Sequence, residues 1–265
     1  MPGLLFLQIL DERRTLLLQL VRRDFTQRFV GSAAGWLWTI IHPLVLLASW
    51  TFVFQYCFKM PPPAGAGPNY TLYLFCGYLP WLLFQETVQR SATCCTDHAN
   101  LITKTVFPAE ILPVSVFLSS LISHGIGLAL AILAVGLLTG HASVMIVFLP
   151  LYTFLLGLLA VGVGWMVASL QVYLRDTAQV TSVVLTGMFW LTPIFIDEHQ
   201  FPGPAQFLVH WNPLAHIVRA YRARLMNYDL PSLRELLLLS LAAAVVFITG
   251  GLLFRYLKRG FADVL

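Results

Sequence analysis

The sequence predicts an all-α membrane protein with six transmembrane helices in one chain. The 265 residues are 58% hydrophobic and 11% charged, whereas soluble domains are roughly half apolar and about a quarter charged. The mean hydropathy is +0.78. The apolar residues form long runs without charges, and most of the 16 basic residues lie between those runs. These observations indicate a chain that crosses a membrane several times.

A helix needs about 20 mostly apolar residues to cross the hydrocarbon layer of a membrane. Six runs of this scale are present, at residues 36–58, 70–88, 111–138, 144–170, 178–196 and 236–254. The second run is the weakest, because it contains Pro80 and carries Glu86 in its last turn. Membrane helices tolerate proline, and a terminal charge can lie at the interface. We therefore expect six spans.

The basic residues predict the orientation, because Lys and Arg accumulate in short cytoplasmic loops. With both termini in the cytoplasm, eleven of the 16 basic residues fall on that side. The other five are Lys59, Arg219, Arg222, Arg224 and Arg234. We therefore expect both ends of the chain to be cytoplasmic.

Residues 1–34 predict an amphipathic helix that lies on the cytoplasmic face of the membrane, ahead of a single transmembrane domain at 35–265. Apolar and basic side chains alternate here in a pattern typical of interfacial helices. A simple lipid anchor explains the pattern, and so does an anchor that also contacts a cytoplasmic partner. The glycines from Gly31 to Gly35 predict a turn into the first span.

Residues 200–227 are too charged to span a membrane and too apolar for an ordinary hydrated loop. Such segments are candidates for re-entrant or interfacial helices, which need protein or water to satisfy their backbone. We expect a lid on the outer side here, before the last span.

Several kinds of chemistry are missing from the sequence. It contains no GxxxxGK[ST] phosphate loop, no HExxH and no GxSxG. The four cysteines form no CxxC pair, so we expect neither a metal site nor a cofactor in this chain. Cys57 and Cys76 flank one predicted outer loop and are either a disulfide or two small buried hydrophobes. The basic residues are dispersed, which argues against nucleic acid as a partner.

The stretch NLITKTVFPAEILP at 100–113 lies between the second and third predicted spans. Pro108 and Glu110 suit the first turn of a helix, so a new helix is expected to begin near Phe107. Residues 93–106 then form a short cytoplasmic element that carries Asn100 and Lys104. It is either a solvated loop or a projecting element that another protein binds.

Motifs along nearly the whole chain extend this interpretation. They are RRDFTQRFVGSAAGWLW at 22–38, NLITKTVFPAEILP at 100–113, LRDTAQV at 174–180, TPIF at 192–195, NPLAHIVRAYR at 212–222 and RGFADVL at 259–265. With these motifs the chain resembles the permease subunits of type 2 ABC exporters of lipid-linked polysaccharides such as O-antigen. Teichoic-acid exporters are close relatives of that family.

The resemblance implies a membrane subunit of an ATP-driven exporter in the bacterial inner membrane. It implies no enzyme activity in this chain, two copies of the chain, and two ATP-binding cassette subunits that bind ATP and Mg²⁺. It also implies a coupling helix at about 93–106 and external gate helices at about 200–227. The expected cargo is a lipid-linked polysaccharide of the O-antigen type, and teichoic acid or capsular polysaccharide is the alternative.

The same resemblance implies roles for individual residues. The residues expected near the ATPase are Asn100, Leu101, Thr103, Lys104, Arg22, Arg23, Asp24 and Arg28. The residues expected at the external gate are Trp211, Asn212, Pro213, Arg219 and Arg222. Arg219, Arg222 and Arg224 either hold the phosphate of the cargo or contact phospholipid headgroups.

A conduit for sugars needs aromatic faces that make broad contact without tight binding. The candidates for the channel wall are Trp50, Phe54, Tyr56, Tyr73, Tyr78, Trp81, Phe84, Phe189 and Trp190. The competing explanation is the ordinary belt of Trp and Tyr at membrane interfaces. A membrane-embedded lipid or sugar transferase is the alternative from a different functional class.

Overall fold

The computed structural model describes residues 14–59, 70–105, 107–140, 143–226 and 230–265. Within these ranges every regular element is a helix, so the all-α class is confirmed. The helices are α2 (Arg14–Gln27), α3 (Trp38–Thr51), α4 (Tyr70–Asp97), α5 (Ala99–Lys104), α6 (Ile111–Thr139), α7 (Leu149–Tyr173), α8 (Thr177–Leu191), α9 (Gly203–Trp211), α10 (Pro213–Met226), α11 (Leu233–Leu257) and α12 (Phe261–Val264).

Four helical segments of the described residues are long and apolar enough to cross a membrane. They are Gly35–Cys57, Ile111–Thr139, Val144–Tyr173 and Leu233–Val264. The first includes α3 with short helical turns at both ends, and the second is α6. Of the other two predicted spans, α8 has only 15 residues and α4 is less apolar. Length and composition therefore identify four of the six predicted spans.

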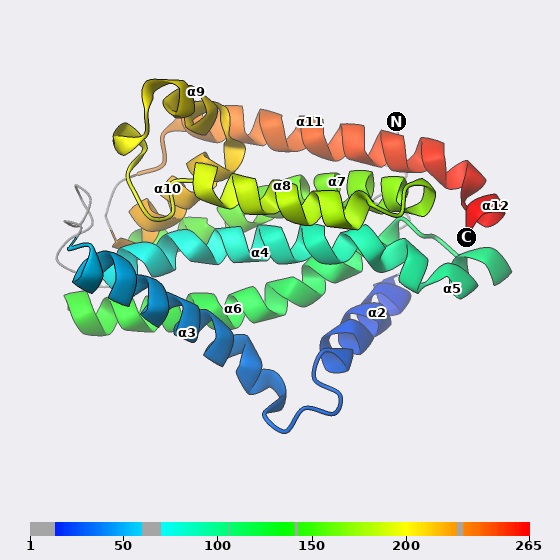
Figure 1. Cartoon of the computed structure of the whole chain (residues 1–265), viewed down its shortest axis with the longest axis horizontal. Coiled ribbons are helices and arrows are strands. Elements are labelled where there is room, and N and C mark those ends of the chain that lie inside the picture. Colours follow the sequence, from blue (N-terminus) through cyan, green and yellow to red (C-terminus); the bar gives the residue numbers. More distant parts are fainter. Residues whose placement is uncertain (1–13, 60–69, 106, 141–142, 227–229) are drawn as a thin grey trace.

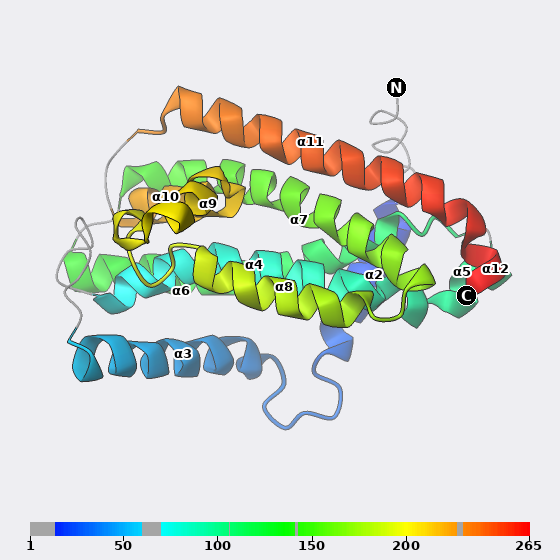
Figure 2. The same cartoon turned by 45° about the horizontal axis from the view of Figure 1, so that its top comes forward.

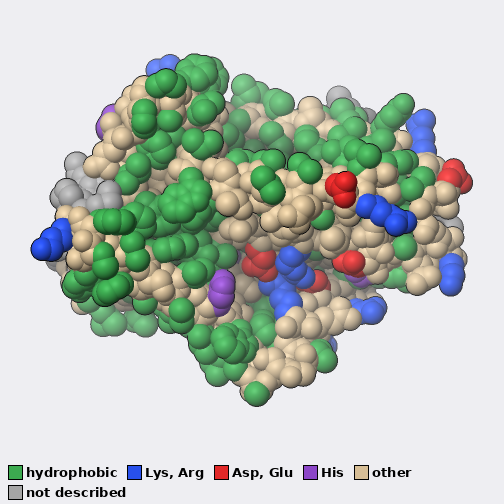
Figure 3. All heavy atoms as spheres, viewed as in Figure 1, with side chains coloured by type: hydrophobic (Ala, Val, Ile, Leu, Met, Phe, Trp, Pro, Cys, Tyr) green, Lys and Arg blue, Asp and Glu red, His purple; other side chains and the backbone are tan. Residues whose placement is uncertain are grey.

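The long helices α4, α6, α7, α8 and α11 lie side by side (Figures 1 and 2). The short helices α5 and α12 lie at one end of this bundle, and α9 and α10 lie at the other. Figure 3 shows apolar side chains over much of the surface and charged side chains gathered toward the end with α5 and α12. The surface in this view is thus largely apolar, and its charged side chains are more frequent in the half that holds α5 and α12.

Helix α4 is the centre of the bundle, since it packs against α6, α7, α8 and α10. Most of its side chains are buried, and they lie on all sides of the helix. A helix surrounded by other helices does not need a surface that is compatible with lipid. This position explains how α4 can hold Glu86 and Arg90 and still lie among much more apolar helices.

Helices α7 and α11 form the most extensive helix pair in the molecule. Their backbones come so close at Gly162 and Gly250 that a Cβ at Gly250 would collide with the Gly162 carbonyl. Small residues allow this kind of close approach between membrane helices. The pair therefore depends on glycine at both positions.

The turn predicted between α2 and the first span is confirmed. Gly31 and Gly35 have φ angles of 78° and 52°, a backbone region that glycine adopts without steric cost.

Cys57 and Cys76 do not form a disulfide in this structure. Cys57 is exposed and Cys76 is buried, and both are free thiols.

Candidate functional site

The predicted coupling element is shorter than expected. Helix α4 continues to Asp97, so residues 93–97 belong to it, and α5 covers only Ala99–Lys104. Residue 106 lies outside the described residues. The prediction that a new helix begins near Phe107 is wrong, because residues 107–110 form tight turns and α6 begins at Ile111.

The surface of α5 is polar and accessible. Asn100, Thr103 and Lys104 are exposed, and Leu101 is half-buried. The Thr103 hydroxyl donates to the Ala99 carbonyl at 2.9 Å, so it caps no other element. Helix α5 therefore presents a small projecting face at the end of the bundle (Figure 1).

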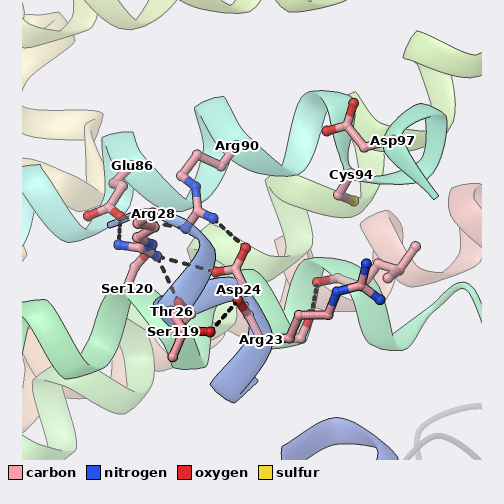
Figure 4. Close-up of polar contacts among 12 residues, drawn as sticks. Arg23, Asp24, Thr26, Arg28, Glu86, Arg90, Cys94, Asp97, Ser119 and Ser120 are labelled. Carbon is pink, nitrogen blue, oxygen red and sulfur yellow. Dashed lines mark hydrogen bonds and ion pairs between the residues drawn. The ribbon is translucent and has the colours of Figure 1, made fainter. Parts of the chain in front are cut away.

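Four charged side chains join α2 to α4 (Figure 4). Arg28, in the turn after α2, donates to the carboxylate of Glu86 in α4, and Arg90 in α4 donates to Asp24 in α2. Arg28 also lies 3.5 Å from Asp24 within its own segment. The charges alternate in sign, so the network as a whole is neutral. We call these four residues the α2–α4 charge network.

Helix α6 closes this network from a third side. Arg28 donates to the hydroxyl oxygens of Ser119 at 2.9 Å and Ser120 at 3.1 Å (Figure 4). Burial of its guanidinium lowers the pKa of Arg28, and the Glu86 carboxylate opposes that effect. Asp24 and Arg28 therefore bind residues of their own chain, whereas Arg22 and Arg23 remain exposed.

The predicted channel residues divide into four groups. Trp50, Tyr78 and Phe189 come together, with ring centroids 4.9 Å apart for Trp50 and Tyr78 and 5.5 Å apart for Trp50 and Phe189. They line a cavity of about 390 Å³ between α3, α4 and α8. Gln85 and Gln89 of α4 line the same cavity. This cavity combines aromatic faces with amide groups.

The other aromatic candidates do not line that cavity. Tyr73, Trp81 and Phe84 are buried inside the chain and are not part of the lining of this cavity. Tyr56 and Trp190 are exposed on the surface. The remaining candidate, Phe54, packs on Phe195 with ring centroids 4.9 Å apart.

Phe195 is a functional candidate that the sequence analysis missed. Its ring lies 5.1 Å from Trp50 and 5.3 Å from Phe189, between centroids. It belongs to the TPIF motif, where the chain leaves α8. The TPIF residues alone do not indicate that Phe195 packs against the rings of Trp50, Phe54 and Phe189.

At the end of the bundle opposite α5, Arg222 of α10 is buried and holds the same segment after α8. Its guanidinium donates to the Tyr73 hydroxyl at 2.9 Å and also bonds the carbonyls of Pro193 and Ile194. The guanidinium carbon lies 3.6 Å from the centre of the Tyr73 ring. A Cβ at Gly77 would collide with the Arg222 guanidinium. The phosphate interpretation is therefore wrong for Arg222 in this conformation.

Arg219 lies one turn away and has polar partners of its own. It donates to the Glu198 carboxylate at 2.8 Å and to Nδ1 of His216 at 2.6 Å. His216 in turn donates from Nε2 to the carbonyl of His210 in α9 at 2.8 Å. Burial lowers the pKa of His216. Arg219 and His216 thereby connect α10 to α9 and to the turn before it.

Two other predicted gate residues lie where α9 meets α10. Asn212 donates to the Thr192 hydroxyl at 3.2 Å and accepts from the Leu214 amide at 3.0 Å. Pro213 is the first residue of α10, the position that suits proline. Trp211 is 72% exposed, so it is available for a contact outside this chain.

No group of three or more His, Cys, Asp or Glu residues that could hold a metal occurs among the described residues.

The sequence analysis did not identify Glu86 and Arg90 as partners of α2. Their presence within a largely apolar helix could have indicated a partner, because ionisable residues in membrane helices are rare and usually paired.

Comparison with known proteins gives a consistent result. The profile of a family described as "ABC-2 type transporter" matches residues 15–226. The O-antigen export system permease protein RfbA of Myxococcus xanthus is 26% identical over 96% of both chains. RfbA of Klebsiella pneumoniae is 27% identical over 94% of this chain and 95% of its own length. The polysialic acid transport protein KpsM of Escherichia coli is 24% identical over 77% of this chain and 78% of its own.

Proposed function

The chain belongs to the ABC-2 type transporter family, and from this membership we propose that it is the membrane subunit of an exporter of lipid-linked, O-antigen-type polysaccharide. The similarity to O-antigen export permeases over nearly the full length of both chains carries the proposal. Capsular polysaccharide is the second candidate, supported by the weaker similarity to KpsM.

Export against a gradient needs an energy source, and this sequence has no phosphate loop. We assign ATP and Mg²⁺ to two separate ATP-binding cassette subunits, which act with two copies of this chain. The subunit itself is then not an enzyme. This division separates the proposal from a lipid or sugar transferase, which would turn over its substrate without an ATPase.

We assign six spans, with α4 and α8 added to the four apolar segments. The 28 residues of α4 cover about 42 Å at 1.5 Å per residue, which is enough to cross. Its burial among other helices removes the need for a lipid-facing surface. The 15 residues of α8 cover about 22 Å, and the following TPIF segment completes the crossing.

The distribution of basic residues then supports an inner-membrane protein with cytoplasmic termini. In this orientation α5 and α12 face the cytoplasm, and α9 and α10 face outward as gate helices. Helix α2 lies along the cytoplasmic interface, where its exposed Arg22 and Arg23 meet anionic lipid or the ATPase.

We assign ATPase docking to α5, through the exposed Asn100, Thr103 and Lys104 and the half-buried Leu101. Movement of α5 reaches the membrane part directly, because α4 ends at Asp97 and α5 begins at Ala99. The α2–α4 charge network then makes α2 follow α4. Asp24 and Arg28 act in this transmission, through contacts inside the chain.

We assign cargo contact to the cavity of about 390 Å³. Trp50, Tyr78 and Phe189 offer faces to the apolar side of sugar rings. Gln85 and Gln89 lie one helical turn apart in α4 and offer amides to sugar hydroxyls. Weak contacts of both kinds suit a polymer that must slide.

A complementation experiment tests this function. A strain that lacks the gene should lose surface polysaccharide and accumulate the lipid-linked polymer inside. The wild-type gene should restore export, and a Lys104→Glu variant present at the same level in the membrane should not. Normal surface polysaccharide in the deletion strain, or turnover of a lipid-linked sugar by the purified chain alone, would contradict the proposal.

A further inference from the structure

The last eight residues of the chain fold back against the cytoplasmic end of the bundle. Phe261 is only 1% exposed, and its ring lies 5.5 Å from that of Phe254 and 6.2 Å from that of Tyr173, between centroids. An apolar ring this deeply buried fixes the segment that carries it. The chain end is therefore part of the packed structure.

Two polar contacts fix the same segment. Lys258 donates to the Glu110 carboxylate at 2.6 Å, and the Tyr173 hydroxyl donates to the Leu257 carbonyl at 2.7 Å. Glu110 is the residue directly before α6, so the first contact reaches the segment that follows α5. A Cβ at Gly260 would lie 2.5 Å from the Tyr173 hydroxyl oxygen, so a larger residue there would displace the Tyr173 side chain.

Helix α12 packs against α5, and both lie at the same end of the molecule (Figures 1 and 2). Each of the two helices exposes polar residues, Asn100, Thr103 and Lys104 on α5 and Asp263 on α12. Ala262 and Val264 of α12 are exposed too. The accessible surface at this end thus comes from two helices that are distant in sequence.

We propose that α12 and α5 together form the docking surface for the ATP-binding cassette subunit, with Asp263 as a direct contact and Phe261 as a positioning residue. This inference rests on the proposed function, which supplies the ATPase as the partner of α5. An ATP-binding cassette subunit that binds α5 also contacts α12, because the two helices pack against each other. The opposite charges of Lys104 and Asp263 require complementary charges on the ATPase.

Binding measurements test the inference. The permease is placed in lipid nanodiscs, and the dissociation constant is measured for the ATP-binding cassette protein encoded in the same gene cluster. Asp263→Lys is expected to weaken binding about tenfold, a typical effect of reversing an interface charge. Phe261→Ala is expected to weaken it at least as much, and Phe261→Leu to stay within about threefold of wild type. Glu235→Lys, at the far end of α11, is the matched charge reversal and is expected to leave binding unchanged.

The outcomes separate the two proposals. If Lys104→Glu weakens binding while Asp263→Lys and Phe261→Ala bind like wild type, this inference is overturned and the proposed function stands. If wild type does not bind the ATPase, both are overturned. If Phe261→Ala fails to fold, the binding of Asp263→Lys alone tests the inference, because the Asp263 side chain is exposed.

Discussion

Arg28 and Glu86 are 58 positions apart in the chain, and the guanidinium of Arg28 donates a hydrogen bond to the Glu86 carboxylate. This contact fixes the turn after α2 to the central helix α4. The hydroxyls of Ser119 and Ser120 in α6 accept from the same guanidinium. Three segments of the chain therefore depend on one partly buried cation.

Removal of either partner of this pair is expected to destabilise the protein. Glu86→Gln leaves the guanidinium of Arg28 without its main carboxylate, at a cost of about 1–3 kcal/mol. Arg28→Gln should cost a similar amount, and the double variant should cost less than the sum of the two. Melting temperatures in detergent measure these effects.

The control for this prediction is Arg22→Gln, because Arg22 is exposed on α2, the helix directly before Arg28. Its melting temperature should match that of wild type. Additive losses in the double variant would show that Arg28 and Glu86 do not act as a pair.

The α7–α11 contact predicts a large effect of one methyl group. Gly250→Ala places a Cβ against the Gly162 carbonyl, and neither backbone can move away easily. Overpacking of this kind costs about 1–3 kcal/mol. Gly136→Ala in α6 is the matched control, since a Cβ there meets nothing within 4 Å. Equal melting temperatures for the two variants would contradict the close contact.

Gly77 and Arg222 are expected to act as one unit. Gly77→Ala should displace the guanidinium from its carbonyl partners, and Arg222→Lys should lose most of the same hydrogen bonds. Each variant should lower the free energy of unfolding by about 2 kcal/mol, and the double variant should be little worse than either. Thermal unfolding checks the stability, and a surface polysaccharide assay checks export. Independent losses would contradict a shared role.

His216 predicts a pH dependence of stability. Burial lowers its pKa, so the folded chain binds the proton less well than the unfolded chain, whose pKa is about 6.5. The contribution of neutral His216 to the free energy of unfolding is therefore complete above about pH 6.5. It is lost as the pH falls toward the pKa of His216 in the folded chain.

The comparison that measures this is the melting temperature at pH 7.5 and pH 5.5. Wild type should lose stability at the lower pH, and His216→Gln should lose less. His199→Gln is the control, because the His199 side chain is 88% exposed. A variant at 216 with the same pH dependence as wild type would exclude His216 as the cause.

The sequence predicted features that depend on local pattern. The apolar run at 111–138 and the helix Ile111–Thr139 agree closely, because hydrocarbon thickness sets the length of both. The turn at Gly31–Gly35 was also predictable, since it needs only glycine's backbone freedom.

Features that depend on distant partners were not predictable. The carbonyls that hold Arg222 come from residues after α8, and no spacing rule connects them to α10. The start of α6 was misplaced because Pro108 allows a tight turn as well as a first helical turn. The burial of Trp81 and Phe84 follows from the central place of α4, which composition does not reveal.

We propose that a separate ATPase drives this chain through α5, and photo-crosslinking in cells tests this proposal. A photoreactive amino acid at Thr103 should crosslink to an ATP-binding cassette subunit. The same amino acid at Trp211, at the opposite end of the bundle, should give no such product. Absence of the Thr103 crosslink, in cells where the labelled protein still supports export, would contradict the claim.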